Sequence, residues 1–215
     1  MSDIRAVIFD MDGLLMDSEG LGIAGIRESA LLQGVDLPES IIRRCIGITA
    51  KASSDLYHSH YPRLDTDRLF KDFLSFMHRK ATEKKIPLKK GAGELLAFLA
   101  ETGIPAAVAS SSRMETICTY LDSVEIKDCF QQLISASGMP SKPAPDVFLL
   151  AAEKLGTAPE KCLVLEDSYN GVKAGRAAGM QVCMVPDLLP YTEDVAPYVD
   201  HVLPDLIAVM ELIKR

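Results

Sequence analysis

The chain has 215 residues, of which 48% are hydrophobic and 25% are charged, and this composition excludes disordered, collagenous and fibrous proteins. The net charge of −7 offers no extended basic field to a nucleic-acid backbone, and the apolar runs are far shorter than the about 18 residues of a membrane span. Five cysteines without CxxC spacing suit reduced thiols, so we expect a cytoplasmic protein. We also expect a monomer that binds neither nucleic acid nor membrane.

The chain opens with a predicted strand and continues with a long helical stretch. Residues 4–9 are β-branched and aromatic and stop at Asp10, as a buried parallel strand does. Helical patterns without a convincing strand follow at residues 21–33, 38–45, 52–61 and 67–83. Apolar residues at helical spacing are expected to form the core of this stretch: Phe70, Phe73, Leu74 and Met77. We predict an all-α helical cap domain at residues 16–84, inserted into a core domain of residues 1–15 and 85–215.

After the insertion, strands and helices alternate. Strands are predicted at residues 105–109, 133–134, 162–165 and 181–185. Helices are predicted at residues 92–101, 114–121, 146–155, 169–178 and 205–214. This alternation predicts an α/β core with a Rossmann-like, mainly parallel sheet covered on both faces. The lysine-rich stretch at residues 84–90 is expected to be a solvated linker.

Acidic residues follow two of the predicted strands. Asp10 and Asp12 lie two residues apart after the first strand, and Glu166 and Asp167 follow a later one. The carboxyl ends of parallel strands meet at one edge of a sheet, where these carboxylates would repel one another without a cation. Oxygen ligands without His or Cys suit Mg²⁺, so the sequence predicts a magnesium site.

A lysine and a run of serines follow two other strands. Lys142 lies beside Pro143, and the nearby prolines stiffen the backbone that directs its side chain. Ser110, Ser111 and Ser112 offer hydroxyl and backbone N–H groups near a helix N-terminus, which is a cradle for anionic oxygens. A carboxylate, a metal, a lysine and serines together favour phosphoryl transfer through an aspartyl phosphate.

Four ordered segments resemble the motifs of the haloacid dehalogenase superfamily. They read DMDGLLMDSE at 10–19, VASSS at 108–112, SKPAPD at 141–146 and LEDSYNGV at 165–172. The chain is most similar to the β-phosphoglucomutase-like phosphatase branch with a helical cap, and the resemblance covers its whole length. Four motifs in the same order are far more specific than DxDG alone.

The resemblance implies a role for each matching residue. Asp10 would be the nucleophile and a metal ligand, and Asp12 the general acid and base whose backbone carbonyl also binds Mg²⁺. Lys142 would neutralise charge, and Asp167, assisted by Glu166, would bind the metal. The implied phosphate- and substrate-binding residues lie in the core and in a cap loop: Ser110, Ser111, Gly47, Thr49 and Lys51.

The predicted function is a Mg²⁺-dependent phosphatase of a small phosphorylated metabolite, such as a sugar phosphate. A phosphomutase is the alternative, but mutase members place a histidine where this chain has Gly20, Leu21 and Gly22. A non-catalytic relative that binds a metabolite is a second alternative, and it would usually lack one of the four central residues, all present here: Asp10, Asp12, Lys142 and Asp167. The substrate itself is not predicted, because the core motifs report the transferred group and not the leaving group.

Overall fold

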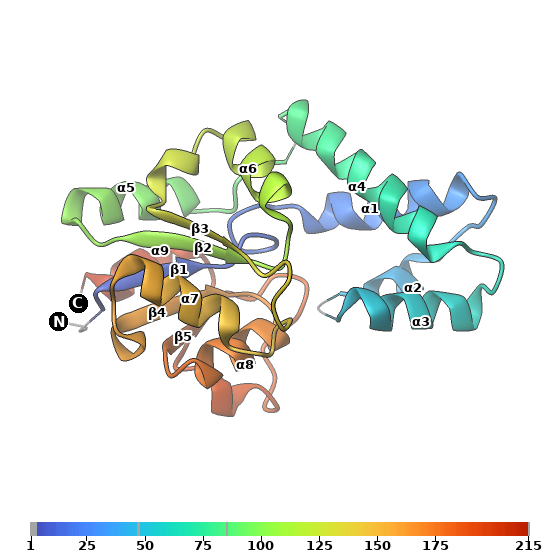
Figure 1. Ribbon diagram of the computed structural model, residues 1–215. Helices are drawn as coiled ribbons and strands as arrows, with labels where there is room; N and C mark the ends of the chain where they lie inside the picture. Colours follow the sequence, from blue (N-terminus) through green and yellow to red (C-terminus); the bar gives the residue numbers. More distant parts are fainter. Residues whose placement is uncertain (1–3, 47, 85, 215) are drawn as a thin grey trace.

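The computed structural model describes residues 4–46, 48–84 and 86–214. It consists of a sheet-and-helix core and a helical unit beside it, and both ends of the chain lie on the side of the core away from that unit (Figure 1). Among the described residues, no helix has the length and apolar character needed to cross a membrane.

The core is built on a six-stranded sheet in the order β3-β2-β1-β4-β5-β6, and every neighbouring pair is parallel. The strands are β1 (Ala6–Phe9), β2 (Ala106–Ser110), β3 (Gln132–Ser135), β4 (Cys162–Glu166), β5 (Gln181–Met184) and β6 (His201–Val202). The first five confirm the sequence prediction. The edge strand β6 was missed because two residues are too few to show a period.

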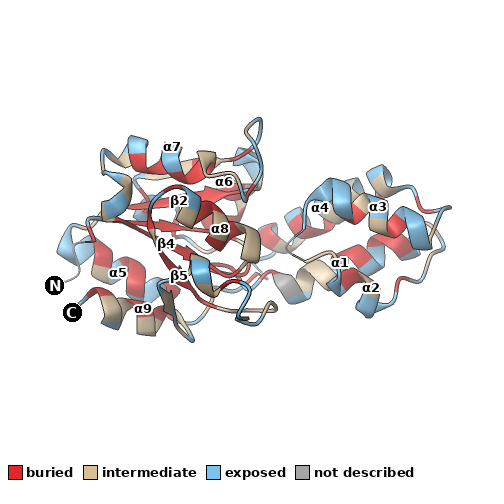
Figure 2. Cartoon of the chain, turned by 90° about the horizontal axis from the view of Figure 1, so that it is seen from below, coloured by how far each residue is buried: buried red, intermediate tan, exposed pale blue. Residues whose placement is uncertain are grey.

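Helices cover both faces of the sheet. They are α5 (Ala92–Thr102), α6 (Met114–Ser123), α7 (Asp146–Leu155), α8 (Tyr169–Ala177) and α9 (Leu206–Ile213). In β1, Val7 and Phe9 pack with α5, α6 and α9, whereas Ala6 and Ile8 pack with α7 and α8. All four β1 side chains are fully buried, and Figure 2 shows the labelled strands β2, β4 and β5 in the colour of buried residues. Burial on both faces explains why this strand is uninterruptedly apolar.

The helical unit follows β1 and has an apolar core of its own. Its helices are α1 (Glu19–Leu31), α2 (Glu39–Arg43), α3 (Ala50–His60) and α4 (Thr66–Thr82). Leu37, Tyr57 and Leu69 are buried in this core. Leu74 was expected there but is 46% exposed, because it lines a crevice between α4 and α6 instead. The division into a cap domain at 16–84 and a core domain remains a prediction.

Two antiparallel linkers join the helical unit to the sheet. The Asp17 N–H donates to the Pro87 carbonyl at 2.8 Å, and the Lys89 N–H donates to the Leu15 carbonyl at 2.9 Å. The Lys89 ammonium lies 2.6 Å from Asp187 and 3.6 Å from Asp17, and its side chain is only 22% exposed. The prediction of a solvated linker is therefore wrong at Lys89, because these two carboxylates hold its side chain against the core.

Candidate active site

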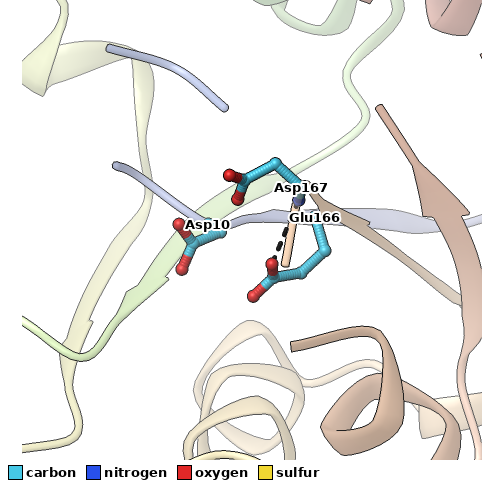
Figure 3. A group of neighbouring side chains, drawn as sticks. All are labelled: Asp10, Glu166 and Asp167. Atoms are coloured by element: carbon cyan, nitrogen blue, oxygen red, sulfur yellow. Dashed lines mark hydrogen bonds between the residues drawn. The ribbon is translucent and has the colours of Figure 1, made fainter. Parts of the chain in front are cut away.

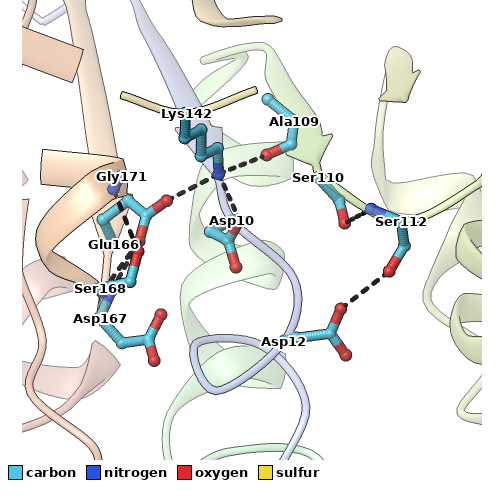
Figure 4. A network of polar contacts seen from close by, with 10 residues as sticks. All are labelled: Asp10, Asp12, Ala109, Ser110, Ser112, Lys142, Glu166, Asp167, Ser168 and Gly171. Atoms are coloured by element: carbon cyan, nitrogen blue, oxygen red, sulfur yellow. Dashed lines mark hydrogen bonds and ion pairs between the residues drawn. The ribbon is translucent and has the colours of Figure 1, made fainter. Parts of the chain in front are cut away.

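The polar residues predicted from separate motifs meet at the carboxyl edge of the sheet. Asp10 directly follows β1, which lies between β2 and β4. Ser110 is the last residue of β2, and Glu166 is the last residue of β4. Parallel pairing of these three strands therefore places the three side chains at one edge, although they are far apart in the sequence (Figure 4).

Lys142 is the centre of this group. Its Nζ donates to Asp10 Oδ1 at 2.5 Å, to Glu166 Oε1 at 2.7 Å and to the Ala109 carbonyl at 3.1 Å. The ammonium also lies 4.6 Å from the centre of the Phe148 ring, on α7. The lysine is buried, so three hydrogen bonds and an aromatic face replace the water that its charge loses.

Glu166 connects Lys142 to the start of α8. Its side chain is fully buried, and Oε2 accepts from the Asp167 N–H at 3.1 Å and from the Ser168 N–H and Oγ at 3.0 and 2.9 Å. A Cβ atom at Gly171 would lie 1.8 Å from the Glu166 Cδ atom. Glycine at this position therefore makes the room that the buried carboxylate occupies at the helix N-terminus.

Asp12 lies on the other side of Asp10 and is held by two hydroxyl groups. Ser18 Oγ donates to Asp12 Oδ1 at 3.2 Å, and Ser112 Oγ donates to Asp12 Oδ2 at 3.1 Å (Figure 4 draws the Ser112 contact). Ser18 precedes α1, but its side chain makes no capping hydrogen bond. The sequence did not identify either serine as a partner of Asp12, since Ser18 lies before α1 and Ser112 after β2, and only the fold brings both to Asp12.

Burial and charge shift the pKa values of these groups. Burial raises the pKa of Asp10 to about 7; Lys142 opposes this shift, and Glu166 and Asp12 add to it. Burial also raises the pKa of Asp12, against the hydrogen bonds from Ser112 and Ser18. For Lys142, burial lowers the pKa, but the carboxylates of Asp10 and Glu166 outweigh burial and keep it above its ordinary value. Lys142 is therefore a permanent cation.

Three carboxylates have the composition of a cation site. Asp10, Glu166 and Asp167 each offer an oxygen, and these atoms all lie within 4.8 Å of one another (Figure 3). All three residues are buried, and an oxygen-only donor set suits Mg²⁺. The residues present therefore fit the predicted metal, with Glu166 already engaged by Lys142 and by the start of α8.

A pocket of about 350 Å³ opens above these groups, between the core and the helical unit. Its lining comprises Asp10, Asp12, Ile46, Ile48, Thr49, Ala50, Ser110, Ser111, Ser141, Lys142, Asp167, Ser168, Asn170 and Leu189. The core residues predicted to bind phosphate, Ser110 and Ser111, belong to it, and so does Thr49 of the helical unit.

Two other predicted cap residues are not part of this lining. Lys51 is 84% exposed and pairs with Asp55 at 2.7 Å, one helical turn away on α3. Gly47 lies outside the described residues. Ile46 and Ile48, from the segment 46–51 that resembles the family's specificity loop, also line the pocket, and so does Leu189, which no motif indicated. An apolar side chain such as Leu189 carries no chemical signal of its own, so only the fold could identify it as lining.

Comparisons with known proteins identify related sequences and related folds. Residues 7–185 match the sequence profile described as "Haloacid dehalogenase-like hydrolase". Hexitol phosphatase B of Escherichia coli (strain K12) is 35% identical over 188 residues, which cover 85% of this chain and 84% of that protein. A phosphorylated carbohydrates phosphatase of Thermotoga maritima is 29% identical over 83% of each chain. The crystal structure of CbbY from Rhodobacter sphaeroides with phosphate superposes with a TM-score of 0.82 at 24% identity, over 94% of this chain and 95% of that one.

Proposed function

The chain belongs to the haloacid dehalogenase-like hydrolase family and is a phosphoric monoester hydrolase, and on that basis we propose a Mg²⁺-dependent reaction through an aspartyl phosphate. The proposed substrate is a small phosphorylated metabolite of the sugar phosphate type, as the names of the relatives suggest. The observation that carries the proposal is the Asp10 carboxylate at the pocket floor, held 2.5 Å from the buried Lys142 ammonium.

In the first step, a carboxylate oxygen of Asp10 attacks phosphorus, and the bond from phosphorus to the alcohol oxygen breaks. Asp12 donates its proton to the departing alcohol oxygen. The raised pKa of Asp12 supports this assignment because burial favours the protonated form that an acid needs. Ser18 and Ser112 hold the Asp12 carboxyl group by both oxygens, which fixes its direction.

In the second step, the deprotonated Asp12 takes a proton from water. The water oxygen attacks phosphorus of the aspartyl phosphate, which releases inorganic phosphate and restores Asp10. Lys142 compensates negative charge on Asp10 and on the phosphoryl oxygens throughout, and the Ser110 and Ser111 segment faces the same pocket.

We assign the metal to Asp10 and Asp167, with Glu166 keeping Lys142 in place and the Asp12 backbone carbonyl as a further ligand. When bound, Mg²⁺ would supply positive charge that favours the Asp10 carboxylate and offsets charge on the phosphoryl group. The helical unit at 16–84 would act as a cap, since two linkers join it to the core and its residues complete the pocket.

Release of inorganic phosphate tests the proposal. The purified protein with Mg²⁺ should hydrolyse p-nitrophenyl phosphate and members of a sugar phosphate panel, and EDTA should abolish turnover. Asp10→Asn should remove nearly all activity and leave the circular dichroism spectrum unchanged. Turnover in the Asp10→Asn protein equal to the wild-type rate would exclude Asp10 as the nucleophile.

A further inference from the structure

The pocket has two chemically different sides. The core side carries Asp10, Asp12, Lys142 and Asp167, which are the groups that face a phosphoryl group in the proposed reaction. The cap loop, which faces the core across the pocket, and the segment after β5 complete the lining. Four of its side chains are apolar and are here named the apolar wall: Ile46, Ile48, Ala50 and Leu189. A bound phosphate ester would therefore place its leaving group against the apolar wall.

In the described part of the pocket, positive charge lies on the core side. Among the described residues that line the pocket, Lys142 is the only cation, and Asp10, Glu166 and the Ala109 carbonyl already hold its ammonium group. Lys51, one residue beyond the wall, is turned to solvent and paired with Asp55. Arg113 lines a separate crevice between α4 and α6. A second anionic group at the wall would thus lose water without gaining a cationic partner.

Polar groups on the cap side are scarce as well. Thr49 is the one polar cap side chain among the described pocket residues, and its Oγ1 accepts a hydrogen bond from the Ala52 N–H at 3.2 Å. Ile48 is 42% exposed in this structure, so a ligand can still cover its surface. Contact with carbon and hydrogen atoms of a ligand would remove this apolar surface from water.

We propose that the protein selects phosphate monoesters whose leaving group is an uncharged alcohol that turns a carbon–hydrogen face to the apolar wall. Esters that carry a second phosphate or a carboxylate are disfavoured. This inference rests on the proposed phosphatase function and adds the class of substrate to it.

Matched substrate pairs test the inference through kcat/KM for phosphate release. Glucose 6-phosphate and 6-phosphogluconate have the same carbon chain, as do glycerol 3-phosphate and 3-phosphoglycerate, and one member of each pair bears a carboxylate. Fructose 6-phosphate and fructose 1,6-bisphosphate form a third pair. The neutral member should have the higher kcat/KM in each pair, by about 10-fold or more, which is the size of one discriminating contact.

Substitutions at the wall locate the source of the preference. Ile48→Lys should reduce the ratio between neutral and charged members by about 10-fold or more, because it supplies the missing cation. Ile48→Met keeps an apolar side chain of similar size and should preserve the ratio. Leu32→Lys adds the same charge at a solvent-exposed site of α1's C-terminal end, away from the pocket, and should also preserve it.

The outcomes distinguish a failure of this inference from a failure of the phosphatase function. Hydrolysis with equal or higher kcat/KM for the charged members would overturn the inference and leave the phosphatase function intact. If Ile48→Lys and Leu32→Lys changed the kcat/KM ratio between neutral and charged members equally, the apolar wall would not be the source of the preference. Absence of phosphate release from every ester, including p-nitrophenyl phosphate, would overturn the phosphatase function and this inference with it.

Discussion

Gly171→Ala should damage the site without touching any reacting group. The new Cβ would lie 1.8 Å from the Cδ and Oε1 atoms of Glu166, whereas carbon atoms in ordinary contact are at least about 3.5 Å apart. The carboxylate must therefore move by more than about 1 Å, which breaks its 2.7 Å contact with Lys142 or pulls the lysine away from Asp10. Disrupting a buried ion pair typically costs about 3 to 5 kcal/mol, and a shift of about 1 Å at a catalytic group can cost about 100-fold in rate.

The measurements are thermal unfolding and kcat for phosphate release, compared with Gly93→Ala as a control. Gly93 is an exposed residue of α5, and a Cβ there meets no atom within 4 Å, so this variant should keep both properties. If the clash with Glu166 is the cause, Gly171→Ala should cost little further in a Glu166→Ala background, because the clashing carboxylate is gone. Fully additive losses in the double variant would refute the reasoning.

Three further predictions follow from the site. Asp12→Asn should lower kcat by about 100-fold to 10,000-fold, the usual contribution of general acid–base catalysis, and should flatten the pH–rate profile; an unchanged profile would contradict the role of Asp12. In metal-free protein, the pKa of Asp10 is raised by burial to about 7, so the folded state prefers protonated Asp10 and the free energy of unfolding should fall as the pH rises from about 4 to 7. Urea titrations in EDTA should show a smaller fall for Asp10→Asn, and equal slopes for the two proteins would contradict this assignment. With β-glucose 1-phosphate and a bisphosphate activator, inorganic phosphate should greatly exceed glucose 6-phosphate, and efficient isomerisation would instead indicate a mutase.

The core of the site was predictable because its signals are local. Asp10 and Glu166 each follow a short apolar run, and such runs report buried parallel strands whose carboxyl ends share an edge. The sequence also predicted the bounds of α7 correctly, because the glycine after its last residue is a local stop signal. Gly156 ends that helix in a left-handed conformation with φ of 64°.

Features that depend on how distant segments come together were not predictable. Ser18 and Ser112 come from different segments and meet only at Asp12, and the Lys89 side chain meets carboxylates from a linker and from the segment after β5. Lys51 looked suited to a ligand, but its neighbour one helical turn later is Asp55, which pairs with it at the surface. A sequence shows which groups exist, whereas the direction of an exposed side chain depends on its three-dimensional neighbours.

Chemical trapping of the phosphorylated enzyme tests the central claim most directly. During turnover with Mg²⁺ and a phosphate ester, borohydride reduces an aspartyl phosphate to homoserine, which peptide mass spectrometry detects as a loss of about 14 Da. The account predicts this change at Asp10 in the wild-type protein and its absence in Asp10→Asn and in enzyme without substrate. Reduction at another carboxylate of the wild-type protein would contradict an aspartyl phosphate at Asp10. So would the absence of reduced Asp10 in the Asp12→Asn variant while that variant slowly turns over substrate.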